Sequence, residues 1–212
     1  ALVFANGEAP DAAWAADIVQ PTDLILAADG GLRHVLSLGL TPAFLVGDLD
    51  SVTAGEISQA ASLGCQVKRY PKKKDQTDLE IALLCAIGQQ ADTILILGAL
   101  GGRIDHELGN ISLLLMPELK DLEVRILARG LEIFIISNTR EISGARNDVI
   151  SLLPWGGPAG GISTQGLYYP LKSETLTPER SRGLSNVMLA TTARVQVESG
   201  ALLCIHTQKG ME

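Results

Sequence analysis

Short apolar runs alternate with amphipathic stretches through residues 1–127. The runs predict strands over 2–5, 24–28, 43–46, 93–97 and 124–127, with a further strand near 65–69. The stretches between them predict helices over 11–19, 32–38, 53–62, 79–87 and 104–116. Because strands and helices alternate with brief connections, this part predicts an α/β domain with a Rossmann-like parallel sheet and flanking helices.

The pattern changes near residues 128–130, where helical periodicity stops. Later apolar runs, separated by Gly, Pro, Ser and Asn, predict strands over 132–136, 148–153, 194–197 and 201–205. No convincing helix lies between them, which is typical of a small antiparallel β-sandwich. We therefore expect two domains, residues 1–128 and 129–212.

Composition narrows the class of protein. The 212 residues carry a net charge of −7, which argues against a nucleic-acid partner. Residues 1–120 hold 15 acidic against 8 basic side chains, whereas 121–212 hold 9 of each, so the negative excess lies in the α/β part. No apolar run is long enough to span a membrane, and three widely spaced cysteines in apolar surroundings indicate reduced thiols. We expect a cytoplasmic protein.

Acidic groups follow three of the predicted strands. Asp48 and Asp50 leave the run 43–46, and two further groups, residues 74–78 and 101–106, follow later strands. Loops at the carboxyl edge of an open α/β sheet bind ligands, and crowded carboxylates need a counter-charge. Mg²⁺ takes oxygen ligands and bridges carboxylates to substrate phosphates, so this edge predicts a magnesium and phosphate site.

Each of these groups also has a structural interpretation. Asp48 and Asp50 are residue types common in turns and helix caps. Thr77 with Glu80 has the pattern of a capping box, and Arg103 with Glu107 that of a surface pair. The glycines of 98–102 permit phosphate contacts but match no phosphate-loop motif. The run Lys72-Lys73-Lys74 reads slightly better as a solvated loop than as a polyphosphate attractor.

The predicted sandwich contains one aromatic pair, Tyr168 and Tyr169. These rings could pack across a sheet, or one of them could stack on a cationic heterocycle.

Taken in order, six motifs resemble the thiamine pyrophosphokinase family. They are Ala28-Asp29-Gly30-Gly31, Gly47-Asp48-Leu49-Asp50-Ser51, Lys74-Asp75-Gln76-Thr77-Asp78, Gly101-Gly102-Arg103-Ile104-Asp105-His106, Gly166-Leu167-Tyr168-Tyr169 and Ser185-Asn186. The resemblance implies a catalytic nucleotide-binding α/β domain, a thiamine-binding β-sandwich and a homodimer with active sites between subunits. It implies transfer of the diphosphate of ATP to the hydroxyl of thiamine, with Mg²⁺ as cofactor, giving thiamine diphosphate and AMP by in-line attack on the β-phosphorus.

The resemblance also implies roles for individual residues. Asp48, Asp50 and Asp78 would hold Mg²⁺, and these three with Asp75 and Asp105 form the expected catalytic set. The expected ATP and phosphate contacts are Asp29, Gly30, Gln76, Thr77, Gly101, Gly102, Arg103 and His106. Thiamine would be bound by Tyr169, Ser185 and Asn186, with Tyr169 standing where several family members have Trp. The general base, either Asp75 or Asp105, stays open.

Two other functions compete with this interpretation. The same fold could transfer diphosphate to another hydroxymethyl heterocycle such as a pterin. From a different class, the chain could be a nucleotide or thiamine-diphosphate sensor without catalysis, although a sensor would not need to keep every expected acid.

Overall fold

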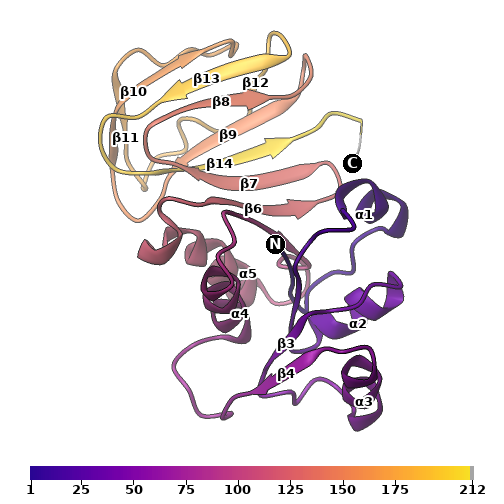
Figure 1. Ribbon diagram of the computed structural model, residues 1–212. Coiled ribbons are helices and arrows are strands. Elements are labelled where there is room, and N and C mark those ends of the chain that lie inside the picture. The colour runs from indigo at the N-terminus through magenta and orange to yellow at the C-terminus, as the bar shows by residue number, and fades with distance from the viewer. Residues whose placement is uncertain (211–212) are drawn as a thin grey trace. The chain divides into compact units, whose positions relative to one another are not determined.

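The computed structural model describes residues 1–210 and divides into two compact units, Ala1–Ala128 and a second that begins at Arg129 (Figure 1). The first unit contains parallel strands with helices, and the second contains antiparallel strands. The predicted fold class is therefore confirmed. Each unit is described by itself.

The first unit is built on a parallel sheet in the order β6-β5-β1-β2-β3-β4. Its strands are β1 Leu2–Phe4, β2 Ile25–Ala28, β3 Phe44–Gly47, β4 Gln66–Arg69, β5 Thr93–Leu97 and β6 Glu123–Ala128. The helices are α1 Ala12–Ile18, α2 Gly31–Ser37, α3 Ala54–Ser62, α4 Asp78–Gly88 and α5 Ile104–Ser112, followed by the 3₁₀ turns η1 Leu113–Leu115 and η2 Pro117–Leu119. Every helix predicted from the periodicity is present.

The helix ends follow from local chemistry. Asp11 caps α1, Thr53 caps α3 and Thr77 caps α4, each by accepting a backbone N–H three residues on. Helix α5 ends at Ser112, four residues before the predicted end. The chain tightens there into 3₁₀ turns ahead of Pro117, whose ring cannot continue an α-helix.

Strands β1, β2 and β3 are buried and bring the acidic motifs to one edge, whereas β4 at the end of the sheet is largely exposed. The side chains of Phe4, Leu26 and Leu45 are fully buried, as both covered faces of a parallel sheet require. Strand β2 is followed directly by Asp29 and strand β3 by Asp48. Because neighbouring parallel strands end at the same edge, these carboxylates lie side by side.

The second unit is a sandwich of two antiparallel sheets over one apolar cluster. One sheet has the order β12-β9-β14-β7 and the other β11-β10-β13-β8. The strands are β7 Leu131–Ile136, β8 Thr139–Ser143, β9 Val149–Pro154, β10 Ala159–Gln165, β11 Glu174–Leu176, β12 Asn186–Val187, β13 Thr192–Gln196 and β14 Leu202–Thr207. Buried side chains from both sheets, among them Phe134, Ile162 and Val195, form the core.

Strand β14 is tied to the start of β9 by a buried polar pair. His206 Nε2 lies 2.9 Å from Asp148 Oδ2, and both side chains are almost fully buried. His206 therefore has a structural role in this unit. Within the part of the chain that is described, no helix is long and apolar enough to cross a membrane.

Candidate active site

Three carboxylates meet at the edge of the parallel sheet. Asp29, Asp48 and Asp78 each place an oxygen within 4.8 Å of an oxygen of the other two. They come from the end of β2, the end of β3 and the first turn of α4. Gly47 makes this approach possible, because a Cβ at that position would lie 3.1 Å from the Asp78 carboxyl group.

The electrostatics of the cluster centre on Asp78. Burial, with the like charges of Asp48 and Asp29, raises the pKa of Asp78 above its usual value, although Lys74 opposes this. The Lys74 ammonium lies 3.0 Å from Asp78 Oδ1 and 3.9 Å from Asp48 Oδ2. Asp78 Oδ1 is buried and accepts no well-aligned hydrogen bond from the described residues. The cluster thus offers carboxylate oxygens that suit a hard cation.

Asp50 lies outside this cluster. Its carboxylate pairs with Lys72, which lowers the pKa of Asp50, and both side chains are exposed. The backbone explains the divergence from Asp48, because Leu49 between them has a φ of 63°. Residues two apart share a face only in extended backbone, so this left-handed residue turns the second carboxylate away.

A cavity of about 630 Å³ opens beside the carboxylates. This volume lies within the roughly 300–1,000 Å³ typical of ligand pockets. The predicted site residues that line it are Asp29, Asp50, Thr77, Asp78, Gly101, Gly102, Arg103 and His106. Gly30, Asp48, Asp75, Gln76 and Asp105 are not among its lining residues, although Asp48 belongs to the adjoining carboxylate cluster.

The loop between β5 and α5 is hydrogen-bonded to an acidic side chain, Glu107, in the first turn of α5. Gly101 donates its backbone N–H to Glu107 Oε1 at 2.9 Å, so this donor is already engaged. Arg103 pairs with Asp105 rather than with Glu107, and both partners are exposed. That pairing raises the pKa of Arg103 and lowers that of Asp105. In this arrangement the Asp105 carboxylate is the counter-ion of Arg103.

The three thiamine-site candidates lie in the second unit. Asn186 is buried, accepts the Tyr169 N–H at 2.9 Å and donates to the Tyr169 carbonyl at 2.7 Å. The Tyr169 ring is exposed and meets Tyr168 edge-on at 4.8 Å between centroids. Tyr169 and Asn186 line a cavity of about 220 Å³, which Ser185 does not line. Asn186 therefore fixes the backbone that presents Tyr169.

Comparisons with known proteins identify the family. Residues 15–126 match the family model described as thiamin pyrophosphokinase, catalytic domain, and residues 135–202 match its vitamin B1 binding domain. A thiamine pyrophosphokinase of Bacillus subtilis (strain 168) is 30% identical over 87% of this chain and 87% of its own length. The chain belongs to the thiamine pyrophosphokinase family. The predicted family and enzyme class are thereby confirmed.

Solved structures agree with this assignment. The thiamine pyrophosphokinase structure from Bacillus subtilis superimposes with a TM-score of 0.88 at 27% identity, covering 98% of both chains. A thiamin pyrophosphokinase from Geobacillus thermodenitrificans gives a TM-score of 0.84 over 99% of this chain and 97% of its own. Its 24% identity supports the fold alone.

Sequence reasoning overlooked three side chains at this thiamine pyrophosphokinase site. For Lys74 the sequence favours a solvated loop only slightly over a polyphosphate attractor, whereas the side chain is 12% exposed and contacts the carboxylate cluster. Glu107 and Asn110 line the cavity and bond the β5–α5 loop, Asn110 through the Ala99 carbonyl.

Proposed function

We propose that this chain transfers the diphosphate of ATP to the primary hydroxyl of thiamine, giving thiamine diphosphate and AMP. The observation that carries the proposal is the cluster of Asp29, Asp48 and Asp78 beside a nucleotide-sized cavity, in a chain of the thiamine pyrophosphokinase family. Such transfer asks the protein mainly to position two substrates and to neutralise phosphate charge.

The two units would divide these tasks. The cavity of the first unit would hold the polyphosphate of ATP, with Lys74 and Arg103 as cations on its lining. The second unit would hold thiamine, whose cationic ring would stack on the exposed face of Tyr169. Asn186 would keep Tyr169 in place through its two backbone hydrogen bonds.

The carboxylate cluster would hold Mg²⁺ through Asp29, Asp48 and Asp78. An all-oxygen, partly buried donor set fits this cation. When bound, the cation supplies neutralisation of the phosphate oxygens. Asp50, predicted as a third ligand, is paired with Lys72 and would have to leave that partner to contribute.

Lys74 would help this site in two ways. Its ammonium group neutralises Asp78 and Asp48 in the free enzyme, which lets three carboxylates coexist. When a divalent cation takes that role, the ammonium group is available to phosphate oxygens across the same cavity. A general base stays unassigned, because Asp75 is exposed and Asp105 is paired with Arg103.

We further propose the homodimer and cytoplasmic location expected from the sequence. Support for a dimer comes from α5, where Ile104 and Leu108 stand one turn apart and are 67% and 50% exposed. Size-exclusion chromatography with light scattering tests the dimer, since a monomer mass at micromolar concentration would contradict it.

The activity is tested by incubating the protein with thiamine, ATP and Mg²⁺ and separating the products, with EDTA as control. We expect AMP and thiamine diphosphate in equal amounts, only when metal is present. ADP with thiamine monophosphate would instead indicate a simple kinase. ATP binding by calorimetry with no product from thiamine or from a hydroxymethyl pterin would favour the sensor.

A further inference from the structure

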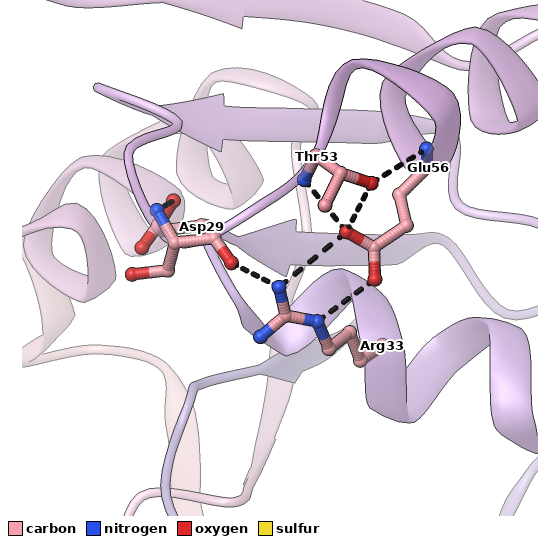
Figure 2. A network of polar contacts seen from close by, with 5 residues as sticks. Asp29, Arg33, Thr53 and Glu56 are labelled. Atoms are coloured by element: carbon pink, nitrogen blue, oxygen red, sulfur yellow. Dashed lines mark hydrogen bonds and ion pairs between the residues drawn. The ribbon is translucent and has the colours of Figure 1, made fainter.

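The connection between β3 and α3 is held by a network centred on Arg33 (Figure 2). The Arg33 guanidinium donates to Glu56 Oε1 at 2.8 Å through Nε, and its terminal nitrogen contacts Glu56 Oε2 and the Ser51 carbonyl. Glu56 also accepts the Thr53 N–H at 2.7 Å and the Thr53 hydroxyl at 2.8 Å. Arg33 on α2 thereby ties down the start of α3.

The same network reaches the carboxylate cluster through one residue, Ser51. Ser51 accepts from Arg33 at its carbonyl and donates its N–H to Asp29 Oδ1 at 3.3 Å. Asp48 Oδ1 accepts the Asp50 N–H at 3.1 Å within the same loop. Two of the three clustered carboxylates therefore depend on the position of the backbone that Arg33 holds.

Two non-glycine residues at this edge lie in the left-handed region, one directly after β2 and one in the β3–α3 connection. Asp29 has a φ of 46° and Leu49 a φ of 63°. This conformation is unfavourable for a residue with a Cβ and persists only where surrounding contacts impose it. The buried side chains of Leu49 and Val52 pack the loop against the core, and the exposed Arg33 side chain contacts it on the solvent side.

Arginine suits this task better than lysine would. Its planar fork reaches two carboxylate oxygens and one carbonyl at once, whereas an ammonium group is a single point charge. The contact is strong enough to hold the pKa of Glu56 at about 2, with Arg33 as the largest cause and the Thr53 cap next. Neither Arg33 nor Glu56 lines the cavity.

We propose that Arg33, through Glu56 and Ser51, is a positioning residue that sets Asp29 and Asp48 at the spacing needed to hold a divalent cation. The inference rests on the proposed function, because it takes the carboxylate cluster as the cation site. Hydrogen-bonding partners behind metal ligands typically contribute roughly 10- to 100-fold to metal affinity.

The test uses Mn²⁺ alone as the probe, with free Mn²⁺ followed by electron paramagnetic resonance. The proteins are wild type, Arg33→Lys, Arg33→Gln, Glu56→Gln and the double variant Arg33→Gln/Glu56→Gln. A circular-dichroism melt shows that each is folded at the assay temperature. Asp78→Asn serves as the reference for a damaged cation site.

We expect both Arg33 variants to bind Mn²⁺ roughly 10-fold more weakly than wild type, because neither reproduces the fork. In Glu56→Gln the single side-chain carbonyl oxygen can still accept the Thr53 N–H, but no second oxygen remains for Arg33. This variant should therefore weaken Mn²⁺ binding to a similar extent. The double variant should bind no more weakly than Arg33→Gln, because the two residues act as a unit. Arg125→Lys, at another Arg–Glu pair on β6, should bind like wild type.

Two results separate this inference from the function on which it rests. If wild type binds Mn²⁺ and Asp78→Asn does not, yet Arg33→Lys binds like wild type, then positive charge alone suffices and the positioning role is wrong. If wild type binds Mn²⁺ no better than Asp78→Asn, the cation site itself is wrong and both proposals fall.

Discussion

Replacing Asp78 with Asn separates stability from function at this site. A carboxylate oxygen of Asp78 lies within 4.8 Å of an oxygen of Asp29 and of Asp48. Asp78 Oδ1 lies 3.0 Å from the Lys74 ammonium nitrogen. At an effective dielectric constant of about 20, repulsion by each of the two acids destabilises the charged Asp78 by roughly 3.5 kcal/mol. Attraction to the Lys74 ammonium stabilises it by roughly 5.5 kcal/mol. Repulsion from the two acids therefore exceeds the attraction by on the order of 1 kcal/mol, before burial adds to it.

The sign of the effect follows from the raised pKa of Asp78, caused first by burial and opposed by Lys74. Because folding disfavours the charged carboxylate, the neutral amide should raise the free energy of unfolding at pH 7. A gain of about 1 kcal/mol corresponds to roughly 2–4 °C in Tm for a chain of this length. The gain should shrink as the pH falls and vanish below pH 3.8, the ordinary pKa of Asp, where Asp78 becomes protonated in the unfolded state as well.

Calorimetric melts in EDTA and in Mg²⁺ test this reasoning. Wild type should gain Tm on addition of Mg²⁺, whereas Asp78→Asn should start higher in EDTA and gain nothing. Transfer to thiamine should fall by more than the roughly 100-fold upper range seen for partners behind a metal ligand. Asp17→Asn, at an exposed acid of α1, should change neither quantity. A lower Tm in EDTA, or wild-type turnover, would refute the account of the cluster.

Three further predictions concern other residues. Tyr169→Ala should raise KM for thiamine roughly 5- to 30-fold, as loss of about 1 to 2 kcal/mol implies, and an equal rise in KM for ATP would remove the stacking role. Asn186→Ala should lower the free energy of unfolding by about 1–3 kcal/mol, because two Tyr169 backbone groups lose their partner; an unchanged urea midpoint would contradict this. Glu56, with its pKa lowered from 4.5 to about 2, stabilises the fold above pH 4.5 and loses that contribution as the pH falls toward 2. In urea titrations the stability gap between wild type and Glu56→Gln should close over that window, and a constant gap would argue against the Arg33 contact.

The helices and parallel strands could be predicted because their signals are local. Apolar spacing sets each helix of the first unit, and caps such as Asp11 and Thr53 set where helices begin. The strands Thr139–Ser143, Ala159–Gln165, Glu174–Leu176 and Asn186–Val187 were not predicted. Strand β10 contains Gly160 and Gly161, and β12 has only two residues, so pairing with distant strands defines them rather than their own pattern.

The candidate site was predictable in its position but not in its detail. Motif spacing places Asp29, Asp48 and Asp78 at one sheet edge, and they do lie together. The partners of Asp50 depend on the left-handed Leu49, and those of Lys74 on how one of three adjacent lysines packs. These are consequences of backbone conformation and packing, which a run of residue types does not encode.

The central claim is that one diphosphate group passes intact from ATP to thiamine at the carboxylate cluster. The most direct measurement uses ATP labelled at the β-phosphorus, with Mg²⁺ and thiamine, and follows the label in wild type and Asp78→Asn. We expect label in thiamine diphosphate, unlabelled AMP, and almost no transfer by the variant. Label retained in ADP, or equal transfer by the variant, would contradict it.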